Sequence, residues 1–271
     1  KSKGLKSSLD KKCMELARYV LPVAIKTHMY HTVSALTLMR LYQTKDLGNC
    51  PQEQGELVGA MVDLAEVAWP GFSSELDVVD TIHRDSNPDY VNLQDVSDHA
   101  REFDERLGSR RSLLTEYSDT AEQTLARAVR SVLCVPSSKM SDDVAIACLL
   151  DPGRNTSIAD TNNVNSMTDM GLAMSAVSYS FEKRLSHTAD SQNQRHRMTP
   201  GTRPRFIVPG DVDIVTPMLI EGNSEVNEYF QAACARVWHG INRLRGAGAS
   251  EEQVQYLAPN AIALRMVEQG N

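Results

Sequence analysis

One short run of the chain concentrates the residues that could bind an anion. Between positions 192 and 205 it carries two glutamines, a histidine and four arginines, of which Gln192, Arg195, His196, Arg197, Arg203 and Arg205 are the candidate ligands. Cations at this density repel one another unless anions neutralise them, so the run predicts a site for a phosphate-bearing ligand. Its first part predicts a helix, on which Gln192 and Arg195 share a face at spacing i, i+3. A loop broken by Pro200 and Gly201 carries the last two arginines.

Helical periodicity dominates the elements that must position this run. Apolar spacing predicts helices over residues 8–41, 52–67, 119–132, 225–244 and 250–269, the first of them kinked or broken at Pro22. The charged residues 98–111 predict a solvated helix that acts as a connector. Ser250 and Gln253 predict a capping box at the start of the last helix. Alternating or β-branched residues predict short strands over 176–181 and 206–208.

Two segments far apart in the chain resemble each other. Residues 15–25 and 252–262 share Glu, Tyr, Pro, Ala and Ile at a constant offset of 237 positions, with Pro22 matching Pro259. A match of this length in helical sequence is weak by itself. It becomes informative when the order of the other motifs is considered.

The pattern Gln-x-x-Arg-His-Arg, followed by a loop and a further arginine, resembles the signature of flavin-dependent thymidylate synthases, the ThyX family. The resemblance implies that Arg195, His196 and Arg197 hold FAD. It also implies an enzyme that methylates dUMP reductively to dTMP, with methylenetetrahydrofolate and NADPH as co-substrates. No enzymic nucleophile is expected, because the flavin supplies the hydride and the protein positions ligands.

The same resemblance implies the nucleotide ligands. Gln192 and Arg205 would bind dUMP, with Arg203 as the alternative to Arg205 for the phosphate. Arg18, in a Glu-x-Ala-Arg-x-x-Leu-Pro segment that is also typical of the family, would be a further nucleotide ligand. The family builds its sites between subunits of a homotetramer, so a homo-oligomer is expected.

The motifs occur in an unusual order. Residues 1–111 resemble the second half of a ThyX domain followed by a connector, and residues 112–271 resemble the first half of another. A tandem arrangement accounts for this order, and a circular permutation is the alternative. The expected fold is α+β, predominantly helical with a small antiparallel sheet.

Some family positions are altered. Pro200 and Thr202 replace a serine and an asparagine of the substrate loop, and Lys45 falls where the family places an arginine. Three hypotheses therefore stay open. The first is an active FAD-dependent enzyme, the second is a catalytically degenerate structural or oligomerisation protein, and the third is a nucleotide-binding regulatory module without flavin.

Composition narrows the classes of partner. The net charge of −7 disfavours nucleic acid and anionic membranes as partners. No apolar run approaches the length needed to span a bilayer, and no signal peptide is recognised. Five scattered cysteines without paired spacing indicate reduced thiols and a cytoplasmic location. His28 and His31 have the spacing of a metal pair, but a core or interface role is expected, so no metal site is predicted.

Overall fold

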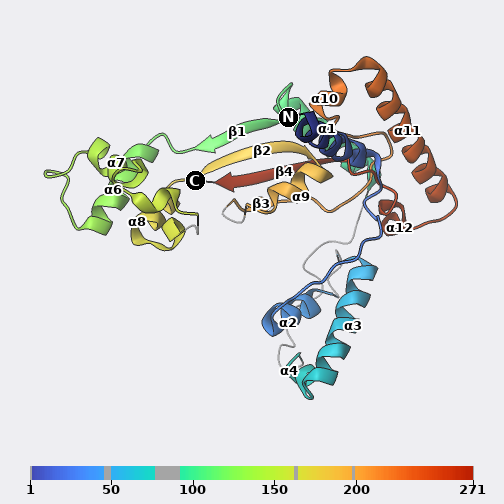
Figure 1. The fold of residues 1–271 in the computed structure, drawn as a ribbon, viewed down its shortest axis with the longest axis horizontal. Coiled ribbons are helices and arrows are strands. Elements are labelled where there is room, and N and C mark those ends of the chain that lie inside the picture. The colour runs from blue at the N-terminus through green and yellow to red at the C-terminus, as the bar shows by residue number, and fades with distance from the viewer. Residues whose placement is uncertain (1, 46–49, 77–91, 162–163, 197–198, 271) are drawn as a thin grey trace. The chain divides into compact units, whose positions relative to one another are not determined.

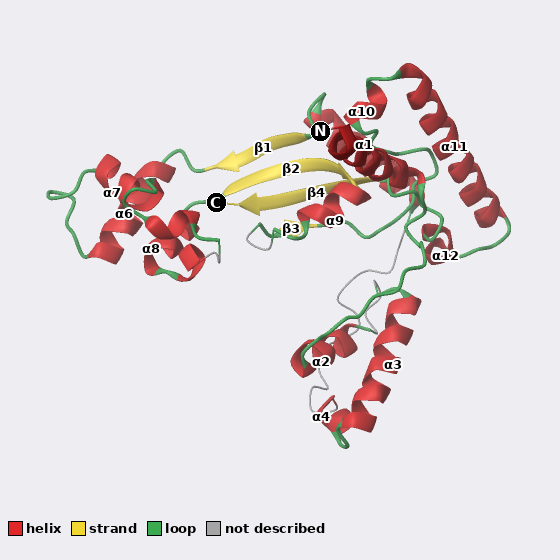
Figure 2. Ribbon diagram, viewed as in Figure 1, coloured by secondary structure: helices red, strands yellow, loops and turns green. Residues whose placement is uncertain are grey.

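The computed structural model of the chain describes residues 2–45, 50–76, 92–161, 164–196 and 199–270. The chain divides into two compact units, one formed by residues 1–99 and 205–260 and the other by residues 100–204 and 261–271. The expected α+β, mostly helical fold with a small antiparallel sheet is confirmed (Figure 2). None of the described helices is long and apolar enough to cross a membrane.

The first unit is helical. Its elements are α1 (Ser2–Ala17), η1 (Arg18–Val20), α2 (Ala35–Thr44), α3 (Gln52–Ala68), α4 (Phe72–Leu76), α10 (Met218–Glu221), α11 (Ser224–Gly246) and α12 (Glu251–Gln255). The helices predicted over 52–67 and 225–244 are therefore confirmed as α3 and α11. The predicted break at Pro22 is confirmed too, but the helix does not resume until Ala35, because Ser34 caps α2 by accepting a hydrogen bond from the Thr37 amide at 3.2 Å.

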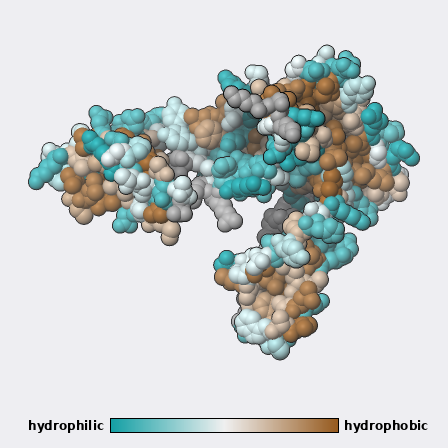
Figure 3. Space-filling model, in the orientation of Figure 1, coloured by the Kyte–Doolittle hydropathy of each residue, from teal (hydrophilic) through white to brown (hydrophobic). Residues whose placement is uncertain are grey.

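Two small cores hold this unit. Leu38, Val58 and Val62 are buried between α2 and α3, together with two residues of α4. On α11, residues at helical spacing are buried on one face: Phe230, Cys234, Trp238 and Ile241. On the outer side of α3, by contrast, the side chains of Leu57, Leu64 and Val67 are more than half exposed. Figure 3 shows hydrophobic surface gathered over the part of the chain formed by α2, α3 and α4.

The two similar segments meet inside the first unit. Pro22 and Pro259 form an isolated antiparallel bridge. The Val23 amide donates to the Ala258 carbonyl at 2.8 Å, and the Asn260 amide donates to the Leu21 carbonyl at 2.9 Å. The offset that relates the two sequences converts one of these hydrogen bonds into the other, so the segments are related by a local pseudo-two-fold axis. Their resemblance therefore extends from sequence to conformation.

The second unit combines a sheet with a helical cluster. It contains the second half of α5 (Leu93–Leu107), then β1 (Ser112–Tyr117), α6 (Ala121–Leu133), α7 (Asp142–Leu150), η2 (Thr156–Ala159), η3 (Val164–Met167), α8 (Asp169–Leu172), η4 (Ala173–Ala176), β2 (Tyr179–Ser186), α9 (His187–Asn193), β3 (Gly201–Thr202) and β4 (Ala263–Gly270). The helix predicted from residue 119 is confirmed as α6. It packs with α7 and η4 around Ala126, Val129 and Leu149, all of which are fully buried.

The sheet is antiparallel, in the order β1-β2-β4-β3 (Figure 1). Its central pair, β2 and β4, is in continuous register from Tyr179 opposite Gly270 to Ser186 opposite Ala263. The strand predicted over 176–181 overlaps β2 but begins and ends too early. Arg265 of β4 donates two hydrogen bonds, of 2.9 and 2.6 Å, to Asp104 of α5. This pair anchors the connector helix α5 to β4.

Two predicted elements are wrong. The helix predicted over 250–269 stops at Gln255, and residues 263–270 form β4 instead, because Pro259 cannot donate within a helix and the following residues pair with β2. Its predicted capping box at Ser250 is confirmed. Residues 206–208 form no strand. They lie between Pro204 and Pro209, and the carbonyl of Val208 accepts instead from the Arg245 guanidinium.

The predicted division at residue 111 into two half-repeats stays a prediction. It concerns the origin of the sequence, whereas the two compact units are defined by contacts in space.

Candidate functional site

The site begins where β2 passes directly into α9. Ser186 ends the strand and caps the helix, since its hydroxyl accepts from the Ala189 amide at 3.1 Å. The His187 amide donates to the Ile262 carbonyl at 2.9 Å, which ties the start of α9 to the residue before β4. The segment that carries the arginines is thus fixed to the centre of the sheet at its entry.

The helix ends earlier than the sequence predicts. α9 stops at Asn193, and Gln194 and Arg195 form a turn in which the Arg195 amide donates to the Gln192 carbonyl at 3.1 Å. The prediction that Gln192 and Arg195 share one helix face is therefore wrong, because only Gln192 is helical. Both side chains are exposed. Arg197, predicted to bind FAD, lies outside the described residues.

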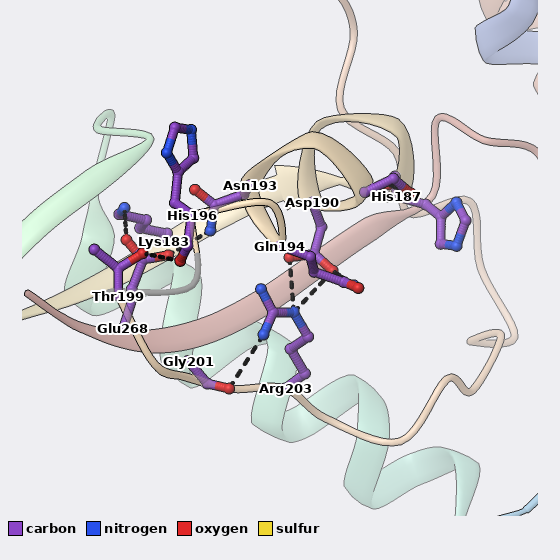
Figure 4. A network of polar contacts seen from close by, with 11 residues as sticks. Lys183, His187, Asp190, Asn193, Gln194, His196, Thr199, Gly201, Arg203 and Glu268 are labelled. Atoms are coloured by element: carbon purple, nitrogen blue, oxygen red, sulfur yellow. Dashed lines mark hydrogen bonds and ion pairs between the residues drawn. The ribbon is translucent and has the colours of Figure 1, made fainter. Parts of the chain in front are cut away.

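His196 and Thr199 shape the tip of the loop. The Thr199 amide and hydroxyl both donate to the His196 carbonyl, at 3.1 and 2.9 Å. The His196 imidazole is exposed and points away from the polar contacts below it (Figure 4). In the described part of the chain, no carboxylate pairs with Arg195 or His196. An exposed guanidinium next to an exposed imidazole without acidic partners suits an incoming phosphate.

Arg203 has a different environment. Its Nε donates to both carboxylate oxygens of Asp190, at 2.9 and 3.0 Å, and its Nη1 donates to the Gly201 carbonyl at 3.2 Å. Asp190 is 2% exposed and also accepts from Gln194 Nε2 at 2.8 Å. The structure thus brings Arg203 back to α9, where its charge is balanced by a buried acid.

A second buried carboxylate lies on β4. Glu268 is 5% exposed and accepts hydrogen bonds from Lys183 of β2 and from Asn193 at the end of α9 (Figure 4). Burial alone would raise the pKa of Glu268, but the hydrogen bonds from Lys183 and Asn193 and the nearby Lys183 charge outweigh it, and the pKa lies below its ordinary value. Glu268 is therefore a carboxylate at neutral pH.

The remaining predicted ligands belong to the first unit. Arg18 begins η1 and is exposed, while Arg205 is half-buried at the start of the unit's second segment. Lys45, at the altered family position, places its ammonium 4.6 Å from the centre of the Tyr42 ring. Among the residues that the structure describes, no three His, Cys, Asp or Glu side chains gather as a metal-binding group.

The long-range contacts that organise the site are what sequence reasoning missed. Asp190 and Glu268 become partners of Arg203 and Lys183 only through the fold, and Glu268 falls in the stretch wrongly predicted as helix. The sequence offered one signal for these contacts. Asp190 lies two positions before Gln192, as the acidic residue of a segment otherwise rich in cations and amides.

Comparison with known proteins gives one result that bears on this site. No curated protein matches the chain. The family model described as thymidylate synthase complementing protein matches residues 3–71 and 113–271, which together make up more than half of the chain and include every predicted ligand. The gap between the two matched segments contains the connector helix α5. The chain therefore belongs to the thymidylate synthase complementing protein family, the ThyX family.

Proposed function

We propose that the chain acts as a flavin-dependent thymidylate synthase that methylates dUMP reductively to dTMP, with methylenetetrahydrofolate and NADPH as co-substrates. The observation that carries the proposal is the exposed guanidinium of Arg195 beside the exposed imidazole of His196, on a loop whose base is held by buried carboxylates. Among the described residues no carboxylate pairs with either side chain, so the charge of Arg195 is available to a ligand.

The residues present fit a phosphate-bearing cofactor. Arg195, His196 and Arg197 would hold FAD, whose bound isoalloxazine ring supplies hydride transfer. The guanidinium of Arg195 can donate two parallel hydrogen bonds to one phosphate, and the neighbouring imidazole adds a third donor. The hydrogen bonds that tie both ends of this loop reduce the backbone freedom that Arg195 and His196 lose on binding.

The nucleotide would be bound by Gln192, Arg205 and Arg18. The amide of Gln192 can both donate and accept, which suits the edge of a pyrimidine, and an arginine suits its phosphate. We propose a homo-oligomer for the working state, since the apolar side chains Leu57, Leu64 and Val67 on α3 are exposed in the single chain.

A second candidate function is a catalytically degenerate family member that serves assembly. The altered substrate loop favours it, since Pro200 and Thr202 remove a hydroxyl and an amide that the family uses there. This candidate predicts assembly without flavin binding.

Flavin binding separates the two candidates. The purified chain is titrated with FAD while flavin fluorescence is followed, in the wild type and in Arg195→Ala. Arg236→Ala is the matched control, because Arg236 is an exposed arginine on α11 outside the cationic run. We expect saturable binding that weakens about tenfold or more in Arg195→Ala, from the loss of a charge-assisted bidentate contact, and is unchanged in the control. Equal binding in all three proteins, or none in the wild type, would remove the proposal.

A further inference from the structure

Two buried carboxylates contact the ends of the loop between α9 and β3 that carries Arg195 and His196, here called the cationic loop. Asp190, on α9, is 2% exposed, and Glu268, on β4, is 5% exposed. Each acidic residue contacts one residue at or directly before the start of this loop in the sequence and one residue that follows it. Acids this deeply buried are stable as anions only when they are paired and hydrogen-bonded, so their partners are fixed in place.

Asp190 joins the entry of the loop to its exit. At the entry, Gln194 Nε2 donates to Asp190 at 2.8 Å. At the exit, Arg203 Nε donates to both of its oxygens, and Arg203 Nη1 continues to the Gly201 carbonyl (Figure 4). Asp190 and Arg203 are thirteen positions apart in the sequence, so their contact holds the two ends of the loop together.

Glu268 on β4 also holds both ends of the loop. Its side chain accepts from Asn193, directly before the loop, and from Lys183 on β2. Its backbone lies opposite Gly201 in the β3–β4 pairing, directly after the loop, and the neighbouring Gln269 amide donates to the Pro200 carbonyl at 2.9 Å. Entry and exit are thus both fixed to the same residue of β4.

We propose that Asp190 and Glu268 act as a paired clamp that presents Arg195 and His196 to the ligand, and that Arg203 is a positioning residue of this clamp and not a phosphate ligand. The inference rests on the proposed nucleotide and flavin site and deepens it, because it separates Arg203 from Arg205. While Arg203 gives Nε to a buried carboxylate and Nη1 to a carbonyl, it cannot chelate a phosphate through its Nε side, and only its remaining Nη hydrogens could reach one.

The two roles of Arg203 predict different ligand dependences. A phosphate ligand matters for dUMP and not for deoxyuridine, which lacks the phosphate. The clamp contacts at Asp190 and Asn193 flank Gln192 on α9, the proposed pyrimidine ligand, so loss of a clamp residue weakens both compounds by the same factor. The roles also differ for lysine, which keeps the charge but cannot place an Nε–H between the two oxygens of Asp190.

The experiment measures dissociation constants of dUMP and deoxyuridine for the full chain carrying Arg203→Gln, Arg203→Lys, Asp190→Asn, or Arg203→Gln with Asp190→Asn. For each compound we expect a loss of about tenfold in every variant, and a double variant no weaker than the worse single one, because both substitutions break one contact. A loss confined to dUMP, absent in Asp190→Asn and largely restored in Arg203→Lys, would overturn the clamp.

A second readout does not depend on any ligand. The rate of tryptic cleavage after Arg195, followed by mass spectrometry under native conditions, reports how firmly the loop is held. We expect faster cleavage in Asp190→Asn and in Arg203→Gln, and unchanged rates would contradict the clamp. If the wild type binds neither compound, the proposed function fails, and the cleavage rates still decide whether the loop is clamped.

A matched control separates positioning from general stability. Arg130, a largely buried arginine of α6, donates to Asp142 at 2.6 Å within the helical cluster of the same unit. Arg130→Gln should destabilise the unit and leave both dissociation constants and the cleavage after Arg195 unchanged. An equal loss of ligand affinity in Arg130→Gln would mean that the effects of the clamp variants reflect stability alone, which would overturn the positioning role.

Discussion

Glu268→Gln isolates the charge of one clamp residue while keeping its shape. Gln can still accept one hydrogen bond, but it leaves the Lys183 ammonium without its anionic partner. The side chain of Lys183 is 21% exposed and that of Glu268 is 6% exposed, so the pair is mostly removed from water. The substitution therefore leaves a partly buried cation unpaired in the centre of the sheet.

The magnitude follows from that burial. Breaking a buried ion pair by removing one partner costs roughly 3–5 kcal/mol. Because a fifth of the Lys183 side chain reaches water, part of the cost is recovered by hydration, and we expect a loss of about 2–3 kcal/mol in the free energy of unfolding at pH 7. Urea unfolding followed by far-ultraviolet circular dichroism measures this loss. Tryptophan fluorescence is unsuitable, since both tryptophans, Trp69 and Trp238, lie in the first unit.

The pH dependence tests the cause. The pKa of Glu268 is lower in the folded protein than in the unfolded chain, so its contribution is present above the unfolded pKa and is lost as pH falls through the folded one. The difference in unfolding free energy between wild type and Glu268→Gln should therefore be largest at neutral pH and shrink below about pH 4.

A control on the neighbouring strand sharpens the comparison. Glu182 pairs with Arg106 at 3.2 Å, but the Arg106 side chain is 50% exposed, so Glu182→Gln should cost under about 1 kcal/mol. The reasoning is refuted if Glu268→Gln costs no more than Glu182→Gln, or if its cost is as large at about pH 3 as at pH 7.

Three further predictions address one buried side chain in each unit and the thiols. Leu149→Ala, at a fully buried position of α7, should lower the free energy of unfolding by about 3 kcal/mol. Leu150→Ala, at a 43% exposed position, should change it by under about 0.5 kcal/mol. Equal losses in urea unfolding would contradict the described core. Trp238→Phe should cost about 2 kcal/mol in thermal unfolding, because the buried indole N–H donates to a backbone carbonyl at 3.1 Å; a change under about 0.5 would contradict that contact. Burial raises the pKa of Cys234 to about 11, so iodoacetamide at pH 8 should modify the exposed Cys134 and spare Cys234 until the protein unfolds; equal modification in the native protein would show that α11 does not bury this thiol.

Helices with one continuous apolar face could be predicted from the sequence. α3, α6 and α11 were found because local periodicity decides which face is buried, and no distant partner is needed to form them. β4 could not be found in this way. Its residues carry a helical rhythm by chance, and only pairing with β2, about eighty positions earlier in the chain, makes them a strand.

In the candidate site, too, one part could be predicted from the sequence and the other depends on the fold. The exposed part, Arg195 and His196, could be predicted from residue types alone, since a cationic cluster is visible without knowing the fold. The supporting part could not, because Lys183 and Glu268 are 85 positions apart and meet only across the sheet. Arg203 was predicted as a possible phosphate ligand on charge alone, and its contact with Asp190 depends on how the loop returns to α9.

The most direct test of the proposed function is a dUMP titration of the FAD-reconstituted chain, with the flavin absorbance between 350 and 500 nm as the readout. The proposal predicts that FAD binds, and that dUMP shifts the flavin bands saturably in the wild type and does so much less in Gln192→Ala. A spectrum that does not respond to dUMP, or a chain that takes up no FAD, would contradict a shared flavin and pyrimidine nucleotide site and leave the assembly function as the better account.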